Sequence, residues 1–266
     1  MKLIADSGGT GTDWALQKQQ NTIYFKGMGL HPDTIKADAS VPEELLQYRC
    51  QVKRIWFYGT GCADSQKAAI VYDFVASIFF NAKVEVFSDL LALAHPIFRQ
   101  KHGLVGILGT GSSMCYYDGK SIYFEVKSPG RGIDPGSGPV IANRILEKYN
   151  KGLLSEYACS FFDEVKKSNS NKILQSSIVN EITFSNLNDN TLRAQIKAAF
   201  EEYLAYYKPL WQKHQLPIIF GGSIAALGET SLREIANTYG LEIVDIIRYP
   251  IQSLAKHYAK YRECNA

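Results

Sequence analysis

The sequence predicts an α/β protein made of two similar domains. Two stretches carry this prediction, because in each an apolar run of strand length leads into a short loop of glycine and hydroxyl residues and then into a second apolar run. The first stretch spans residues 3–16, and the second spans residues 104–117, about 100 residues later. The elements expected after each stretch come in the same order, so the chain repeats a topology without repeating its residues.

Composition limits the classes of protein that fit. A chain of 266 residues with 46% hydrophobic and 21% charged residues suits one large or two ordinary globular domains. A net charge of +3, with no Lys/Arg block longer than Lys166-Lys167, gives no sign of a nucleic-acid partner. The most apolar window, Ile70–Phe80, contains Asp73 and is too short to cross a bilayer.

The cysteines and the N-terminus add two further expectations. The five cysteines form no CxxC pair, so neither a disulfide framework nor a zinc site is indicated. The apolar run at the N-terminus reaches Asp6 too soon to be the core of a signal peptide. We therefore expect a cytoplasmic protein with no membrane partner, and the sequence leaves a homodimer open.

The first half of the chain alternates strand and helix patterns after its opening hairpin. Alternating side chains and aromatic content favour strands, whereas apolar positions spaced by about 3.6 residues favour helices. Ser40 is a candidate N-cap, with Pro42 in the first turn of the helix that follows. The expected elements are a strand at 22–26, a helix from 41 to about 50, a strand at 54–58, a helix at 63–80, a strand at 83–87 and a helix that begins at Asp89.

The second half is expected to copy that order, with additional helices. A stripe of apolar residues from Leu192 to Trp211 has helical spacing and is typical of a core-facing helix. The expected strands are 104–108, 114–117, 121–126, 217–220 and 241–244, and the expected helices are 139–149, 155–167, 174–181, 192–211, one that ends at about 239 and 251–262.

The loop of the first hairpin has the chemistry of an anion site. Glycine lets the backbone approach an anion closely, and successive N–H groups in a turn form an anion-binding concavity. Ser7, Thr10 and Thr12 would expose hydroxyls at the same point, and Asp6 stands at the strand end, where it could hold a metal-bound water. The residues alone leave a glycine-rich turn without a ligand as the alternative.

Seven motifs in a fixed order extend this interpretation over essentially the whole chain. They are Asp6-Ser-Gly-Gly-Thr10, Tyr58-Gly-Thr-Gly61-Cys62, Asp89 with the leucines and alanines after it, Leu108-Gly-Thr-Gly-Ser112, Asp134 with Gly136-Ser-Gly138, Gly221-Gly-Ser-Ile-Ala225 and Pro250-Ile251. Together they resemble the BadF/BadG-type ATPase group, which contains N-acetylglucosamine kinases and belongs to the actin/hexokinase/Hsp70 superfamily.

The resemblance implies two ribonuclease-H-like domains with a nucleotide and a sugar in a central cleft. The first domain would hold residues 1–101 plus 249–266, so that the last helix packs back on it, and the second would hold residues 102–248. The implied cofactors are ATP and Mg²⁺. The implied reaction is phosphorylation of a hydroxyl on an amino sugar, most closely N-acetylglucosamine.

Site residues follow from the same motifs. The first loop (Ser7, Gly8, Gly9, Thr10, Gly11, Thr12) and the second loop (Gly109, Thr110, Gly111, Ser112) would bind the β- and γ-phosphates, and Gly221, Gly222 and Ser223 would bind adenosine. The resemblance implies sugar contacts from Gly61, His31, Asp89, Asp134 and Gly136. Asp6 is our candidate Mg²⁺ ligand, because Mg²⁺ keeps several waters and needs only one or two carboxylates.

Asp89 is the candidate catalytic base. A sugar hydroxyl needs a base within hydrogen-bond reach, and Asp89 stands where a strand ends and a helix begins. The resemblance places the base at the same residue. The local sequence alone equally allows Asp89 to be the N-cap of the helix. The five histidines show no metal-ligand spacing and are expected at the surface or at helix caps.

Three departures from the family pattern keep other functions open. Gly11 stands where the family usually carries Lys or Arg, Pro135 replaces a Glu before Gly136, and His31 stands in place of a sugar-contacting Asn. These changes motivate a non-catalytic nucleotide- or sugar-binding sensor as an alternative. A dehydratase-activating ATPase of the same group is a weaker alternative, because it needs an iron–sulfur cluster and the cysteines lack a suitable local spacing.

Overall fold

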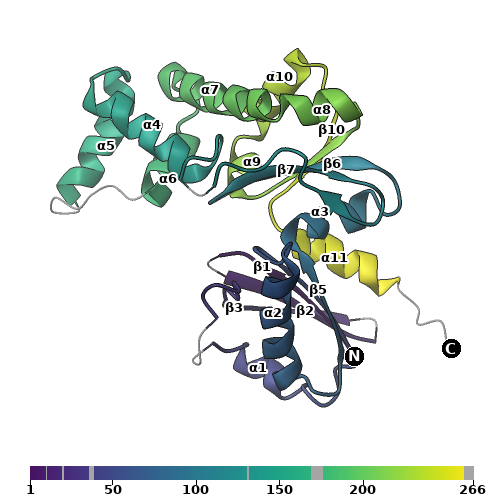
Figure 1. Ribbon diagram of the computed structural model, residues 1–266. Coiled ribbons are helices and arrows are strands. Elements are labelled where there is room, and N and C mark those ends of the chain that lie inside the picture. The colour runs from purple at the N-terminus through teal and green to yellow at the C-terminus, as the bar shows by residue number, and fades with distance from the viewer. Residues whose placement is uncertain (10, 20, 36–38, 131, 169–175, 261–266) are drawn as a thin grey trace. The chain divides into compact units, whose positions relative to one another are not determined.

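The computed structural model describes residues 1–9, 11–19, 21–35, 39–130, 132–168 and 176–260 (Figure 1). The chain divides into two compact units. Unit 1 holds Met1–Lys101, Gly119–Ser121 and the segment from Tyr249 onward, and unit 2 holds His102–Asp118 and Ile122–Arg248. Among the described residues, no helix is both long and apolar enough to cross a membrane.

Unit 1 is built on a five-stranded mixed sheet in the order β3-β2-β1-β4-β5. Its strands are β1 (Lys2–Ser7), β2 (Gly11–Lys18), β3 (Asn21–Met28), β4 (Arg54–Gly59) and β5 (Lys83–Ser88). The first three strands form an antiparallel meander, whereas β1, β4 and β5 run parallel. The carboxyl ends of these parallel strands therefore meet at one edge of the sheet, where open α/β sheets usually bind ligands.

Helices cover both faces of this sheet. Their bounds are α1 (Glu43–Leu46), α2 (Ser65–Ile78), α3 (Asp89–Ile97) and α11 (Pro250–Ala259). Val71 and Val75 of α2 join a core that includes Leu3 and Ala5 of β1. Helices α3 and α11 pack together and contact β1, on the face to which alternation assigns Asp6 (Figure 1).

Unit 2 repeats the topology of unit 1. Its sheet has the order β10-β9-β6-β7-β8, with β6 (Gly103–Leu108), β7 (Ser112–Tyr117), β8 (Ile122–Tyr123), β9 (Ile218–Gly221) and β10 (Ile243–Ile247). As β1 does, β6 pairs antiparallel with the next strand of its hairpin and parallel with a later strand. The structure thus confirms the two-domain α/β prediction and the repeat of topology.

The helices of unit 2 are more numerous and enclose a larger core. Their bounds are α4 (Gly138–Asn150), α5 (Glu156–Ser168), α6 (Ser176–Ser185), α7 (Asn190–Tyr206), α8 (Lys208–His214), α9 (Ser223–Leu227) and α10 (Glu229–Thr238). Phe200, Tyr203 and Phe220 are fully buried in this core. The apolar stripe of α7 therefore faces the core, as its spacing predicts.

Among the expected elements that differ from the observed ones, three are the clearest. The helix expected over 192–211 is split into α7 and α8, because Pro209 in the first turn of α8 has no N–H to continue the ladder of α7. The strand expected at 121–126 is a two-residue edge strand. The helix expected from 41 to about 50 is the single turn α1, which is followed by further turns.

Candidate functional site

The loop of the β1–β2 hairpin lies at the carboxyl edge of the sheet in unit 1. Gly8 and Gly9 are exposed, and the N–H of Gly8 donates to the carbonyl of Gly11 across the turn, at 2.9 Å. The predicted phosphate ligand Thr10 lies outside the described residues. The exposed glycine backbone is what a phosphate-binding turn requires.

Two hydroxyls of this loop are buried, although the sequence predicts that they are exposed. Ser7 and Thr12 are almost fully buried, and their hydroxyl oxygens lie 2.8 Å apart. The Thr12 hydroxyl donates to the carbonyl of Met28, and the Ser7 hydroxyl accepts from the N–H of Leu30. The expectation that these hydroxyls are exposed is therefore wrong: they tie the hairpin to the end of β3. Their assignment to nucleotide binding remains a prediction.

Gly29 supports the same loop, and the sequence motifs do not single it out. A Cβ on this residue would lie 2.9 Å from the carbonyl oxygen of Gly8 and 3.0 Å from the carbonyl carbon of Gly9. Real Cβ atoms essentially never approach that closely, so only glycine lets the chain after β3 pass beneath the loop.

Asp89 begins α3 at the same edge of the sheet. Its carboxylate accepts hydrogen bonds from the Thr60 hydroxyl at 2.7 Å, from the Ser88 hydroxyl at 3.1 Å and from the Leu90 N–H at 3.0 Å. The N-cap of α3 is Ser88, so the interpretation of Asp89 as the cap is wrong. The carboxylate is instead oriented by hydroxyl donors at the ends of two neighbouring strands, from Ser88 of β5 and from Thr60 just after β4.

Asp6 lies close enough to Asp89 for their charges to interact. Burial, followed by the negative charges of Asp89 and Asp13, raises the pKa of Asp6 to about 7. Asp13 pairs with Lys26 at 3.4 Å, whereas no hydrogen bond or ion pair of the Asp6 side chain occurs among the described residues. A half-buried carboxylate with no compensating donor suits a cation.

These residues fit Mg²⁺ better than a metal that needs a full set of protein ligands. Within the described ranges, no group of three or more His, Cys, Asp or Glu side chains could hold a metal ion. Mg²⁺ retains several waters and binds through one or two carboxylates plus phosphate oxygens. Asp6 fits that pattern.

Two predicted sugar-binding residues of unit 1 meet beside Thr60. Gly61 has φ +84°, and a Cβ on it would lie 3.0 Å from Nε2 of His31. The N–H of Asp33 donates to Nδ1 of His31 at 3.2 Å, so Nδ1 is the unprotonated nitrogen in the neutral ring. In that tautomer, Nε2 carries the hydrogen and can donate.

The second glycine loop connects β6 to β7 in unit 2. The N–H of Gly109 donates to the carbonyl of Gly111 at 2.9 Å, and Thr110 at the tip is exposed. Ser112 is buried, and its hydroxyl donates to the carbonyl of Pro135 at 2.6 Å. A backbone hydrogen bond thus closes this loop, as another closes the first one, and its hydroxyl is again bound within the protein.

Asp134 lies beneath this loop and holds it. The side chain is 1% exposed. One carboxylate oxygen accepts from the N–H of Ser112, and the other accepts from the N–H of Gly132 at 3.0 Å. Both carboxylate oxygens therefore accept from backbone N–H groups, so Asp134 supports the loop. Its neighbour Gly136 is buried at φ +77°.

The Gly221–Ser223 turn meets the second loop at the ends of β6 and β9. Gly222 has φ +103°, and a Cβ on it would lie 2.3 Å from the carbonyl oxygen of Leu108. The N–H of Gly138, at the start of α4, donates to the carbonyl of Gly109 at 2.8 Å. The motifs predicted to bind phosphate and adenosine are thus brought together within unit 2, with Ser223 exposed at the start of α9.

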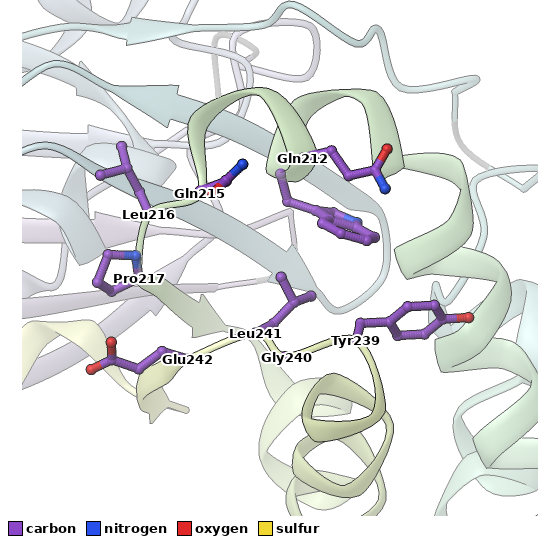
Figure 2. A pocket seen from close by; sticks show the side chains of 9 residues that line it. Gln212, Gln215, Leu216, Pro217, Tyr239, Gly240, Leu241 and Glu242 are labelled. Carbon is purple, nitrogen blue, oxygen red and sulfur yellow. The ribbon is translucent and has the colours of Figure 1, made fainter.

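A separate pocket of about 680 Å³ lies at the opposite end of β9. Trp211, Gln212 and Tyr239 line it together with Pro217, which precedes β9 (Figure 2). Gly221 is the last residue of β9, so the pocket and the glycine loops lie at opposite ends of that strand. None of the predicted site residues lines it.

Comparison with known proteins identifies the fold of this chain but no sequence family. No family model and no curated protein matches the chain. A solved structure from Porphyromonas gingivalis, named "Putative N-acetylglucosamine Kinase", is 25% identical with a TM-score of 0.85, and the match covers 97% of this chain and 98% of that one. A protein of the same name from Chromobacterium violaceum is 16% identical with a TM-score of 0.68, over 96% and 98% of the two chains.

A more distant match shares the same architecture. A ROK family glucokinase from Streptomyces griseus, solved with glucose and AMPPNP, is 13% identical with a TM-score of 0.62 over 93% of each chain. These matches confirm that the chain has the actin-like fold of N-acetylglucosamine kinase-like and ROK proteins, as its motifs imply.

Proposed function

We propose that this chain is an ATP-dependent sugar kinase whose substrate is an amino sugar, most closely N-acetylglucosamine. The observation that carries the proposal is the pair of matching glycine loops. They follow the matching strands β1 and β6 of two units with one topology, and Asp89 lies at the same sheet edge as the first loop. The names of the P. gingivalis and C. violaceum proteins support the choice of sugar.

The two loops act on the phosphates of ATP through their backbone. Gly9 in unit 1 and Thr110 and Gly111 in unit 2 supply N–H groups, because the N–H groups of Gly8 and Gly109 close the two turns. The hydroxyls of Ser7, Thr12 and Ser112 are bound within the protein. Gly222 allows the adenosine turn to pass close to the second loop. The AMPPNP in the S. griseus glucokinase supports ATP as the nucleotide.

Asp6 would hold Mg²⁺, directly or through one of its waters. The bound ion would neutralise charge on the β- and γ-phosphates, which is the main electrostatic demand of phosphoryl transfer. The charge of Asp6 is otherwise uncompensated, so the ion would also relieve the cost of that charge.

Asp89 acts as the general base. The carboxylate accepts the proton of a sugar hydroxyl as that oxygen attacks the γ-phosphorus; the bond from phosphorus to the bridging oxygen breaks, and ADP leaves. Thr60 and Ser88 hold the carboxylate by hydrogen bonds. His31 and Gly61 form the adjoining surface for the sugar, with Nε2 of His31 as a donor to a sugar oxygen.

An ADP-release assay across hexoses, amino sugars and N-acetyl amino sugars tests the proposal. We expect release that requires Mg²⁺ and is highest with N-acetylglucosamine. If calorimetry detects ATP or amino-sugar binding but no sugar releases ADP, the chain is the sensor that Gly11, His31 and Pro135 motivate, and the kinase proposal is wrong.

A further inference from the structure

Two buried tyrosines and a partly buried histidine in unit 1 form a hydrogen-bonded chain. The hydroxyls of Tyr58 on β4 and Tyr258 on α11 lie 2.5 Å apart. The Tyr58 hydroxyl also lies 2.8 Å from Nδ1 of His95 on α3. The network therefore joins a strand of the sheet to both helices on the same face.

Tyr258 makes contacts through its ring and its carbonyl as well as through its hydroxyl. Its ring stacks on Trp56 with 3.9 Å between ring centroids, and its carbonyl accepts from Nζ of Lys2 at 3.2 Å. The side chain is 5% exposed, and Tyr58 is fully buried. Buried tyrosine hydroxyls need hydrogen-bond partners, so each hydroxyl fixes the position of the other.

His95 takes part as a neutral ring. Burial, followed by the charge of His257, lowers the pKa of His95 to about 4. A neutral imidazole has one donor and one acceptor nitrogen, so it can end a chain of hydroxyls without adding a charge to the core. The ring is therefore uncharged near neutral pH, where one of its nitrogens can accept from the Tyr58 hydroxyl.

His95 sits near the end of the short helix that Asp89 begins. Helix α3 has nine residues, from Asp89 to Ile97, and Pro96 lies inside it. Proline has no N–H, so it removes one hydrogen bond of the helix ladder at that end. A side-chain bond from His95 to the sheet is thus well placed to fix a helix whose own ladder is incomplete.

We infer that Tyr258, acting through Tyr58 and His95, positions α3 and with it the Asp89 carboxylate; the catalytic part of this inference rests on the proposed function. Tyr258 is a positioning residue, because it touches neither substrate nor nucleotide in this scheme. Reaction rates depend steeply on the placement of reacting groups, and an error of about 1 Å can cost a factor of about 100. The C-terminal helix α11 thereby becomes a determinant of turnover.

The substitutions Tyr258→Phe and Tyr58→Phe/Tyr258→Phe test the inference, since both keep the rings and remove hydroxyls. We expect kcat to fall about tenfold, with KM for ATP and for the sugar unchanged, because orientation and not binding is altered. We also expect faster amide hydrogen exchange in residues 89–97, measured without any substrate.

Gln17→Leu is the matched control. Gln17 anchors the same helix by donating from Nε2 to the carbonyl of Ala255 at 2.6 Å, and it reaches α11 without a bond to α3. It should lower the melting temperature while leaving kcat and the exchange of residues 89–97 as in the wild type.

The outcomes separate this inference from the proposed function. Wild-type exchange of residues 89–97 in both phenylalanine variants would overturn it, and so would faster exchange with an unchanged kcat. If the wild-type chain shows no sugar-dependent turnover, the kinase proposal fails, and exchange alone decides whether the network fixes α3. An equal loss of kcat in Gln17→Leu would also overturn the inference, because any loosening of α11 would then be enough to lower turnover.

Discussion

At the scale of single residues, Asp89 carries the chemistry of the proposed reaction. The substitution Asp89→Asn keeps the shape of the side chain and an acceptor oxygen for the Leu90 N–H but removes the basic carboxylate. The new NH₂ can donate to the Thr60 hydroxyl, which is able to rotate and accept. We expect a folded protein whose sugar-dependent kcat falls by about 100-fold or more, the usual contribution of a general base. Steady-state ADP release and circular dichroism measure the two properties.

Asp64→Asn is the control for that substitution. Asp64 caps α2 by accepting from the N–H groups of Gln66 and Lys67, and Asn caps a helix about as well as Asp. Activity should stay at the wild-type value. An Asp89→Asn variant with full activity would remove Asp89 from the role of base.

Asp6 gives a prediction of pH dependence. Its pKa is raised from 3.8 to about 7 on folding, so the protonated side chain favours the folded state, and that contribution is lost as the pH rises from about 4 to about 7. Without Mg²⁺, Asp6→Asn should melt at the wild-type temperature near pH 4 and at least about 3 °C higher at pH 8, where roughly 2–4 °C corresponds to 1 kcal/mol.

Mg²⁺ with nucleotide should reverse this order at pH 8. The ion would stabilise the wild type through the ionised carboxylate and would stabilise Asp6→Asn far less. Asp73→Asn, at an exposed position of α2, should follow the wild type under all conditions. A melting temperature of Asp6→Asn that tracks the wild type from pH 4 to pH 8 would contradict the assignment of Asp6.

At the scale of elements, the second loop depends on Asp134. In Asp134→Asn, the amide NH₂ would face one of the two backbone N–H groups that the carboxylate now accepts, so a buried donor loses its partner. We expect a loss of about 1–3 kcal/mol in the free energy of unfolding and a higher KM for ATP. Urea unfolding and kinetics with varied ATP measure these effects.

Asp245→Asn provides the comparison within unit 2, because Asp245 is exposed on β10 and bonds only the N–H of Ile246 among the described residues. It should change neither quantity. If Asp134→Asn alters stability but leaves KM for ATP as in the wild type, the loop that Asp134 supports does not bind the nucleotide.

The elements that could be predicted are those whose residue patterns lie within a short stretch of sequence. The hairpins β1–β2 and β6–β7 were predicted because glycine loops between apolar runs mark their own turns. The burial of Ser7 and Thr12 was not, because it depends on partners at Met28 and Leu30 in another strand. The split between α7 and α8 lay within reach, since Pro209 is visible in the sequence.

Long-range partners explain the largest difference at the candidate site. His95 was expected at the surface or at a cap, whereas it is partly buried and hydrogen-bonds to the buried Tyr58. That network joins Tyr58 to Tyr258, which is 200 positions away in the sequence. No local pattern predicts that one tyrosine hydroxyl will hydrogen-bond to another, so this network can be identified only from the folded structure.

At the scale of the whole molecule, the proposal requires both units to act on one nucleotide. Lid closure around substrates is common in kinases. We expect small-angle scattering to show a smaller radius of gyration with ATP analogue and sugar together than without them. Asp89→Asn should compact in the same way, because it keeps both glycine loops. Unchanged scattering in both proteins would count against a shared nucleotide.

The proposed reaction transfers the γ-phosphoryl group of ATP to an amino sugar. Mass spectrometry of N-acetylglucosamine after incubation with the purified chain, ATP and Mg²⁺ tests it most directly. We predict a sugar that has gained one phosphoryl group, formed in equal amount to ADP, and almost none with Asp89→Asn. ADP without any phosphorylated sugar would show that the chain is not a kinase for this sugar, and equal product from Asp89→Asn would show that Asp89 is not its base.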